Sequence, residues 1–459
     1  MKNMRILISS LVVILIILLQ LKTSDTAIAE SASDQSYKLS LQSAIEKALG
    51  KNPMIDASQA RMSASSERIT QARSGFYPQI FASETYQKTT NPMWAFGMKL
   101  NQADIAQADF IPDRLNDPSA IDNFNTQIGL SWSVFNGGKS WHGLKQADMG
   151  YQASIADLDR TRQEIISQTV FAYTDLVYVS NCNSVVDQSL LTAKAHLKMI
   201  EDRYNNGLTV KSDLLRARVH IAELEQRQVD VKNQILVAEA ALYSVLNEDV
   251  TSSLEPVTPL SEKKVPAKEL AVWIDTAMTK RPDFLKMTWL EKMAQEEIKK
   301  SRSGHLPSLN IQGNYEINTP DFDETADNYT VGANVTVNLF SGLGISAQTR
   351  EALYRHNEIK SQLRAMTLNI RFEIKQAYYM LQSASTRIHV ADISIDEATE
   401  ALRIVKDRYN NGQLSVVSLL DAELTLDRAK NNYYMALRDH MQARVKLDLA
   451  SGTLDAAFQ

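Results

Sequence analysis

The pentapeptide Arg-Tyr-Asn-Asn-Gly occurs twice in this chain of 459 residues, at residues 203–207 and 408–412. Glycine readily adopts the left-handed backbone that ends a helix, and asparagine tolerates it. Each copy therefore predicts a tight turn between two long helices. At about 1.5 Å per residue, the stretches before the turns would span roughly 85 and 100 Å, too long for a compact globule. The flanking stretches that lack glycine and proline are 151–206, 208–255, 345–411 and 413–451.

The N-terminal residues predict an exported protein. Basic residues precede an apolar run over 6–19, and a small-x-small cleavage signal follows at 27–29. This is the order of a secretory signal peptide over residues 1–29, with an uncleaved membrane anchor as the alternative. No later stretch is apolar over enough residues for a membrane helix. With a single cysteine, Cys182, there is no disulfide framework, which fits a bacterial periplasm or outer membrane.

An internal duplication spans most of the chain. Residues 202–218 and 407–423 match at a constant offset of 205, with nine identities in seventeen positions. Upstream the offset is 229, so the first copy has a loop 24 residues longer between its strands. The predicted parts are the signal peptide 1–29, a first repeat 30–247, a linker 248–266, a second repeat 267–450 and a tail 451–459.

Two stretches of the second repeat, 309–317 and 331–339, alternate between apolar and polar residues. Such alternation predicts strands with one apolar face, and their length suits a membrane-spanning strand. Because four strands cannot close a membrane barrel and lipid does not tolerate an open sheet edge, a dimer with eight strands or a trimer with twelve is required. The predicted strands lie at about 78–88, 124–135, 307–318 and 328–340.

Apolar periodicity predicts how the long helices pack. Alanines recur every seven residues from Ala422 to Ala450, which is typical of a close-packed left-handed coiled coil. Each repeat also opens with a short helix, at about 40–50 and 267–279. A proline and a second helix that ends near Ser74 or Ser303 follow each of these.

In this order the features resemble the TolC-like outer-membrane efflux proteins. In each repeat a strand pair leads through Phe-x-Gly into a long helix, and Arg-Tyr-x-x-Gly precedes a Leu-Leu-x-Ala helix. The resemblance implies a mostly α protein with membrane β-strands. In this fold class, a trimeric twelve-stranded β-barrel continues into a twelve-helix periplasmic tunnel. Each chain would contribute four strands and two long helical hairpins.

The resemblance further implies a passive exit duct of a tripartite efflux or type I secretion system in the outer membrane. Expected partners are two further copies in a homotrimer, a periplasmic adaptor protein, an inner-membrane pump of the RND, ABC or MFS type, and outer-membrane lipid. Small-molecule or metal efflux is favoured over protein secretion. The alternative is a periplasmic coiled-coil scaffold or adhesin without a pore, but a scaffold has no need of lipid-facing strands.

The family also suggests a role for the pentapeptides, because its turns meet the tips of the adaptor. The residues assigned to docking are Arg203, Tyr204, Gly207, Arg408 and Gly412. The alternative is that both pentapeptides are only favourable helix–turn–helix sequences.

A gate is expected beside the same turns. The resemblance implies that Asp421 of three copies forms a ring of carboxylates, and that a contact between Tyr409 and Asp213 helps to hold the tunnel closed. This chain departs from the family pattern at Ser418, where a second acid is expected, and at Leu414, where a basic latch residue is expected. The alternative for Asp421 is a capping box with Ser418 at the start of the last helix.

Other chemistry is not supported by the sequence. The formal net charge of −5 argues against nucleic acid. Residues 138–140 resemble the end of a P-loop but lack its first glycine, and the seven histidines show no metal-ligand spacing. We therefore expect no enzyme activity, cofactor or metal site. The loops at 89–123 and 319–327 are acidic, either as solvated loops or as sites of divalent-cation bridging to lipid phosphates.

Overall fold

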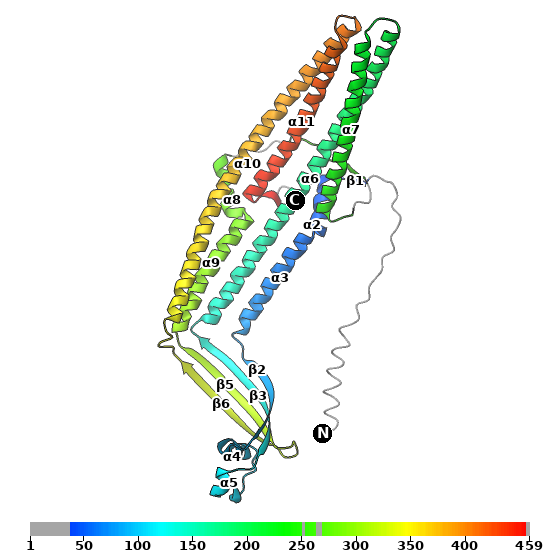
Figure 1. Ribbon diagram of the computed structural model, residues 1–459. Coiled ribbons are helices and arrows are strands. Elements are labelled where there is room, and N and C mark those ends of the chain that lie inside the picture. Colours follow the sequence, from blue (N-terminus) through cyan, green and yellow to red (C-terminus); the bar gives the residue numbers. More distant parts are fainter. Residues whose placement is uncertain (1–36, 250–252, 263–268, 456–459) are drawn as a thin grey trace.

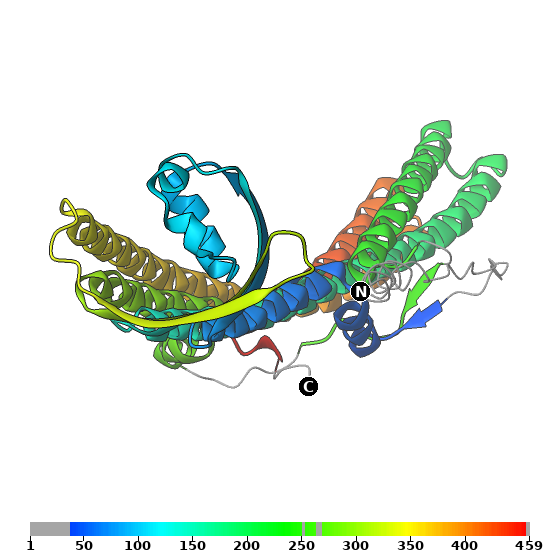
Figure 2. The same ribbon diagram turned by 90° about the horizontal axis from the view of Figure 1, so that it is seen from below.

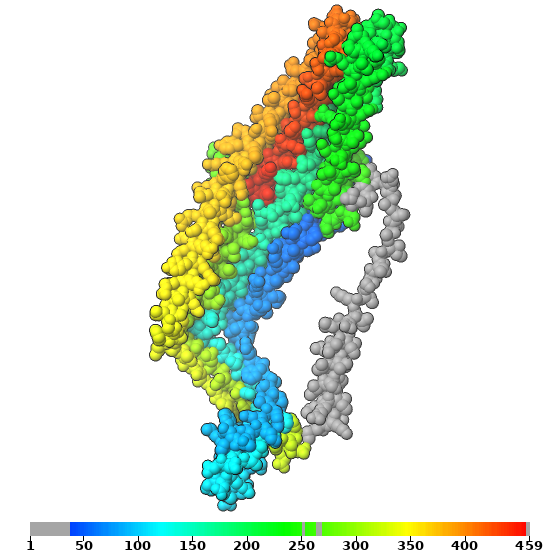
Figure 3. All heavy atoms as spheres, viewed as in Figure 1, coloured from blue at the N-terminus to red at the C-terminus, as the bar shows by residue number. Residues whose placement is uncertain are grey.

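The computed structural model describes residues 37–249, 253–262 and 269–455, so the predicted signal peptide lies outside the described residues. The molecule is elongated, with a four-stranded sheet near one end and two helical turns at the other (Figure 1). The space-filling view shows the same long, narrow shape (Figure 3). We call the end formed by residues 203–210 and 408–415 the tip. Within the described residues, no helix is apolar over a length that could cross a membrane.

Two helical hairpins build the long part of the molecule. Helices α6 (Lys139–Asn205) and α10 (Gly344–Asn410) each contain 67 residues, and their return helices α7 (Lys211–Leu246) and α11 (Val416–Ser451) each contain 36. A helix of 67 residues is about 100 Å long, the length that the sequence predicted for α10. Helix α6 is longer than the predicted length of roughly 85 Å, because it begins at Lys139 and continues through Gly143 and Gly150. Both hairpins therefore keep the repeat offset over their whole length.

Shorter helices pack beside α6 and α10 between the sheet and the ends of the return helices (Figure 1). Helix α2 (Leu41–Lys51) is followed by α3 (Pro53–Ser74), and α8 (Leu270–Lys280) by α9 (Pro282–Arg302). Asn52 caps α3 by accepting a hydrogen bond from the backbone N–H of Met54, and proline at the first helical position suits this start. Helix α9 contacts both α6 and α10, so it joins the two halves.

A small parallel ribbon was not predicted from the sequence. Strand β1 (Tyr37–Leu39) pairs with β4 (Leu254–Pro256), which lies in the segment predicted as a linker. Tyr173 of α6 holds the ribbon in place. Its hydroxyl donates to the carbonyl of Leu39 at 2.9 Å and accepts from the backbone N–H of Thr258 at 2.8 Å.

The four predicted strands form one antiparallel sheet in the order β2-β3-β5-β6. Three of them start and end close to the predicted bounds, but β6 ends at Thr336 rather than near residue 340. Thr336 pairs with Ser308, the first residue of β5, so the ladder has no partner strand beyond it. The bounds are β2 (Gln79–Thr89), β3 (Ile121–Asn136), β5 (Ser308–Thr319) and β6 (Ala326–Thr336).

The register gives the sheet two chemically different faces, because side chains alternate along each strand. Residues that share the apolar face include Ile80, Ile128, Tyr315, Tyr329 and Val331. The opposite face, which we call the amide face, carries mostly uncharged polar groups. Its members include Gln87, Asn123, Asn125, Gln127, Asn310, Gln312, Asn314, Asn318, Asn328 and Asn334.

The connection between β2 and β3 is folded. It contains α4 (Pro92–Asn101), the 3-10 helix η1 (Gln107–Phe110) and α5 (Pro112–Asn116). This is the first of the two acidic segments for which the sequence predicted loops. Its Asp109 lies 2.9 Å from the ammonium of Lys99. Cation bridging by the acidic segments stays a prediction; in the described part of the chain, no three potential metal ligands cluster.

Candidate functional site

Both pentapeptide turns have the same backbone. Gly207 has φ +73° and Gly412 has φ +72°, the left-handed conformation that glycine adopts without strain. The N–H of Leu208 donates to the carbonyl of Arg203 at 2.8 Å, and the N–H of Gln413 to that of Arg408 at 2.9 Å. These bonds satisfy carbonyls that the helix end leaves open. The turn chemistry predicted from the sequence is therefore present in both copies.

The side chains of the two turns are arranged differently. Tyr409 is 5% exposed, whereas its counterpart Tyr204 is 37% exposed. The guanidinium of Arg203 lies over the Tyr409 ring, 5.0 Å from its centroid. It also donates to the carbonyl oxygens of Tyr409 at 3.4 Å and Asn410 at 3.1 Å. Arg203 thus fastens the first turn to the second.

Arg408, the counterpart of Arg203, has no such contact. Its side chain is exposed, and no residue in the described ranges forms a hydrogen bond or ion pair with it. The sequence grouped Arg203 and Arg408 together as docking residues. The structure separates them, because Arg203 is engaged within the chain while Arg408 and Tyr204 are exposed.

A small apolar core supports this arrangement. Tyr409 packs in a cluster contributed by α6, α7, α10 and α11, so burial of its ring joins both hairpins at the tip. The buried members are Ile200, Leu214, Ala217, Tyr409, Val416 and Leu419.

Asp213 lies close to Tyr409 but takes its hydrogen bond from a neighbour in its own turn. Thr209 donates from Oγ1 to its carboxylate at 2.9 Å. Burial raises the pKa of the Tyr409 hydroxyl, the nearby Arg203 lowers it, and the charge of Asp213 raises it again. Tyr409 therefore stays neutral at physiological pH and can donate a hydrogen bond. Asp213 is therefore close enough to Tyr409 for a charge interaction, but no hydrogen bond joins the two among the described residues. The direct contacts with Tyr409 come from Arg203.

The capping-box alternative for Asp421 is wrong. Helix α11 begins at Val416 with Ser415 at the N-cap, so Ser418 lies inside the first turn. The carboxylate of Asp421 is one turn further along and exposed. It has no hydrogen-bond or ion-pair partner among the residues that the structure describes. The Asp421 side chain is thus exposed and unpaired among the described residues, close to the tip.

Polar contacts that the sequence did not reveal join α6 to α11 below the tip. Ser189 donates a hydrogen bond to the carboxylate of Asp427, and His196 Nε2 lies 2.8 Å from a carboxylate oxygen of Glu423. Burial raises the pKa of Asp427, an effect that the bond from Ser189 partly offsets. These side chains are far apart in the sequence, and only their acidic and hydroxyl character could have suggested pairing.

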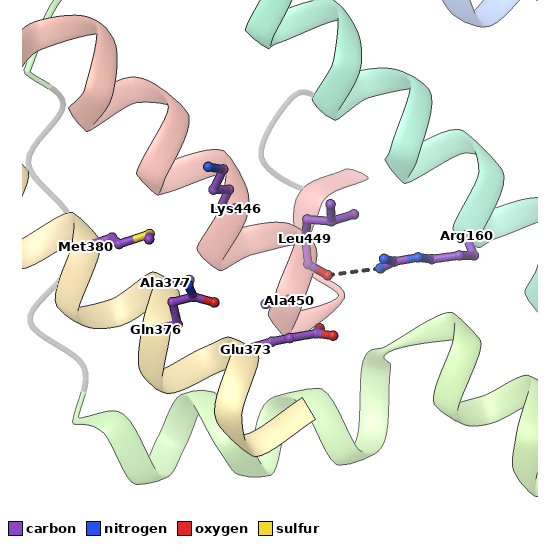
Figure 4. A pocket seen from close by; sticks show the side chains of 8 residues that line it. All are labelled: Arg160, Glu373, Gln376, Ala377, Met380, Lys446, Leu449 and Ala450. Atoms are coloured by element: carbon purple, nitrogen blue, oxygen red, sulfur yellow. Dashed lines mark hydrogen bonds between the residues drawn. The ribbon is translucent and has the colours of Figure 1, made fainter. Parts of the chain in front are cut away.

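Toward the middle of the molecule, α6 also meets the end of α11. Arg160 donates to the carbonyl oxygen of Leu449 at 3.3 Å, beside a cavity of about 240 Å³ (Figure 4). Glu373 at the edge of this cavity is paired with Arg281 at 2.6 Å. The cavity is a gap between helices of the two halves, and its charged lining residues are Arg160, Glu373 and Lys446.

Long paired hairpins joined to a sheet with one apolar face define the class of protein, an outer-membrane channel with a helical tunnel. The chain belongs to the outer membrane efflux protein family, whose model matches residues 44–248 and 273–453. It is therefore an outer-membrane exit duct of the kind used in efflux or type I secretion, and it extends into the periplasm.

Individual relatives are similar over most of their length. Outer membrane protein TolC of Salmonella enteritidis is 20% identical over 415 residues, 88% of this chain and 80% of the relative. The alkaline protease secretion protein AprF of Pseudomonas aeruginosa is 20% identical over 445 residues, covering 92% and 86%. Among solved structures, the CmeC outer membrane channel of Campylobacter jejuni superposes with a TM-score of 0.78 at 18% identity, covering 90% and 86%. The fold class expected from the sequence is confirmed.

Proposed function

We propose that three copies of this chain close one twelve-stranded barrel and form a passive duct that receives cargo from a periplasmic adaptor and an inner-membrane pump. The observation that carries the proposal is the four-stranded sheet, whose two edges, β2 and β6, have no partner strand among the described residues. Its apolar face suits lipid, and lipid does not tolerate unpaired strand edges. Edge pairing between copies removes this cost, and three copies give a membrane-barrel strand number.

The tip is proposed to have two separate tasks. Outward-facing Tyr204 and Arg408 would meet the adaptor, together with the backbone of the turns at Gly207 and Gly412. Arg203 and Tyr409 would hold the hairpins of one chain together and keep the duct closed when idle. Asp213 would add a charge beside Tyr409 that favours donation from its hydroxyl.

Asp421 is proposed to line the constriction. Threefold symmetry would place three of these carboxylates around the axis, where like charges create a field that attracts cations. The exposed carboxylate of Asp421, which has no partner among the described residues, supports this role. Ser418 replaces the second acid of the family pattern, so the ring would carry one acid per chain.

Native mass spectrometry and planar-bilayer recording of the purified protein test the assembly. We expect a trimer mass and discrete, long-lived conductance steps. A dimer mass would contradict closure with twelve strands. A protein that forms trimers without any conductance would support the scaffold alternative.

Docking is tested separately by replacing Gly207 or Gly412 with valine. A β-branched residue is costly at positive φ, so the turn surface should change. Loss of export with normal trimer insertion supports docking or gating at the turns. Gly143→Val is a control within α6, because a Cβ at this glycine also meets nothing within 4 Å and its φ is not positive. Unchanged export in both turn variants would contradict the assignment.

A further inference from the structure

The connection between β2 and β3 differs in kind from the connection between β5 and β6. The first runs from Thr89 to Ile121 and contains α4, η1 and α5, whereas the second runs only from Thr319 to Ala326. We call residues 92–116 the outer cap. In Figure 1 it lies beyond the strands, at the end of the molecule opposite the tip.

The outer cap is folded around its own contacts. Asn91 caps α4 by accepting from the backbone N–H of Met93 at 3.2 Å. Phe96 and Phe110 meet edge to face, with ring centroids 5.7 Å apart. Lys99 pairs with Asp109, whose carboxylate also accepts from the N–H of Ala106 at 2.9 Å. The backbone bond from Ala106 and the pairing with Lys99 lower the pKa of Asp109, so the pair stays charged at neutral pH.

A buried chain of amides fixes the outer cap to the sheet. Gln102 Nε2 donates to the carbonyl oxygen of Asp122 at 2.7 Å and to Asn123 Oδ1 at 2.8 Å. Asn123 Nδ2 donates in turn to Asn318 Oδ1 at 2.9 Å, which also accepts from Asn125 at 3.0 Å. Since buried amide hydrogen bonds are costly to break, this attachment holds the cap in one position.

The anchor lies on the amide face of the sheet. Asn123, Asn125 and Gln127 alternate along β3 with Phe124, Thr126 and Ile128, which share the apolar face with Ile80 and Tyr315. In a membrane barrel the apolar face meets lipid and the polar face lines the interior. Seen along the molecule, the cap lies on the concave side of the curved sheet (Figure 2).

We propose that the outer cap narrows the external mouth of the channel and restricts passage to small solutes. This inference rests on the proposed trimer, since three outer caps would then lie at the external opening of one channel. A short connection such as residues 320–325 cannot cover the interior in this way. The size limit would therefore be set by the first half of each chain, at the end opposite the gate.

The test compares a cap-replaced channel with an intact one in planar bilayers. Residues 90–120 are replaced by the six-residue connection 320–325. Both proteins also carry Arg203→Ala, which should open the tip. A closed tip would dominate the electrical resistance of the channel and hide any change at the outer cap. We expect cap replacement to raise single-channel conductance about twofold and to admit larger polyethylene glycols into the pore. Unchanged conductance and polymer cut-off would overturn the proposal.

A matched pair of point variants tests the anchor itself. Gln102→Leu removes the donor of the buried amide chain, whereas Gln107→Leu changes an exposed glutamine in the same cap. In the Arg203→Ala background, only Gln102→Leu should raise the polymer cut-off, with trimers intact in both. Equal behaviour of the two variants would overturn the anchoring argument. If the parent protein forms neither trimers nor conducting pores, the proposed function itself fails.

Discussion

The two turns at the tip have the same five residues and the same backbone, yet their side chains have different surroundings. In the second turn Tyr409 is buried and covered by Arg203 from the first. In the first turn Tyr204 is exposed. The side chain of Arg408, in the second turn, has no hydrogen-bond or ion-pair partner in the described ranges. Repetition in sequence therefore fixes the turn geometry, and the packing of one hairpin against the other decides what each side chain does.

Because of this difference, we expect different residues to hold the two hairpins together and to bind the adaptor. Arg203 and Tyr409 face the partner hairpin, so changing them should alter closure. Arg408 and Tyr204 are exposed, so changing them should alter only what binds at the tip. Matched substitutions in the two turns can therefore test whether the two turns have different roles.

The largest difference is expected between Arg203→Ala and Arg408→Ala. Loss of the Arg203 contacts should cost about 2 kcal/mol at the tip. That would shift a closed-to-open equilibrium about thirtyfold, and idle conductance in planar bilayers should rise accordingly. Arg408→Ala should leave idle conductance unchanged and reduce export in cells. Equal effects on conductance would show that the two turns are equivalent.

Tyrosine truncation should show a contrast in the local stability of the tip rather than in conductance. Tyr409→Ala removes a buried ring and should destabilise the tip by about 3 kcal/mol, whereas Tyr204→Ala should cost less than about 1 kcal/mol. Hydrogen exchange of the backbone amides around residues 400–420 measures this local stability. Similar protection in both variants would contradict the burial argument.

Replacing the glycine of either turn should instead lower stability by the same amount. Gly207→Ala and Gly412→Ala each place a side chain at positive φ with nothing within 4 Å of the new Cβ. Each should therefore cost about 1 kcal/mol from backbone strain alone. Thermal unfolding in detergent compares the two costs. A clearly larger loss at one turn would mean that the backbones are not equivalent.

Much of the fold could be predicted because its signals are local and repeated. The Asn-Asn-Gly sequence specifies the turns, the long stretches without glycine or proline specify the helices, and alternation specifies the strands. The end of β6 was missed because Val337 and Leu339 continue the alternating pattern. Strand length depends on the partner strand, and β5 has no residue opposite them.

The side-chain arrangement at the tip required the structure. No local pattern reveals that Arg203 rather than Arg408 covers a tyrosine, since the choice depends on how two hairpins 205 residues apart in the sequence pack together. Similarly, the local sequence fits either Ser415 or Ser418 as the N-cap of α11. Burial of Val416 and Leu419 in the core of the tip selects Ser415. The outer cap was missed because its helices are too short to show a period.

The smallest predicted effect concerns the polar contacts between α6 and α11 below the tip. These contacts, too, occur at only one of the two repeat-related positions. Asp427 of α11 accepts from Ser189, whereas the corresponding residues in the other half, Ser394 and Ala222, cannot form such a pair. Burial raises the pKa of Asp427 in the folded state, so its ionised form disfavours folding above that pKa. Asp427→Asn should raise the melting temperature slightly at pH 7.

The size of this effect should depend on pH. As pH falls through the raised folded-state pKa, the native aspartate binds a proton and the advantage of Asp427→Asn should shrink. Melting curves of the trimer between neutral and acidic pH measure the change. An advantage that grows on acidification would show that the carboxylate is stabilising when charged.

Single-channel recording of Asp421→Ala beside the parent protein tests the central claim most directly, that the tip of a trimeric duct forms its gate. The parent should be cation-selective and blocked by multivalent cations, because three carboxylates would surround the axis. Asp421→Ala should form trimers that conduct with weaker cation selectivity and weaker block. Unchanged selectivity and block in trimers that insert normally would place the constriction elsewhere and contradict the account.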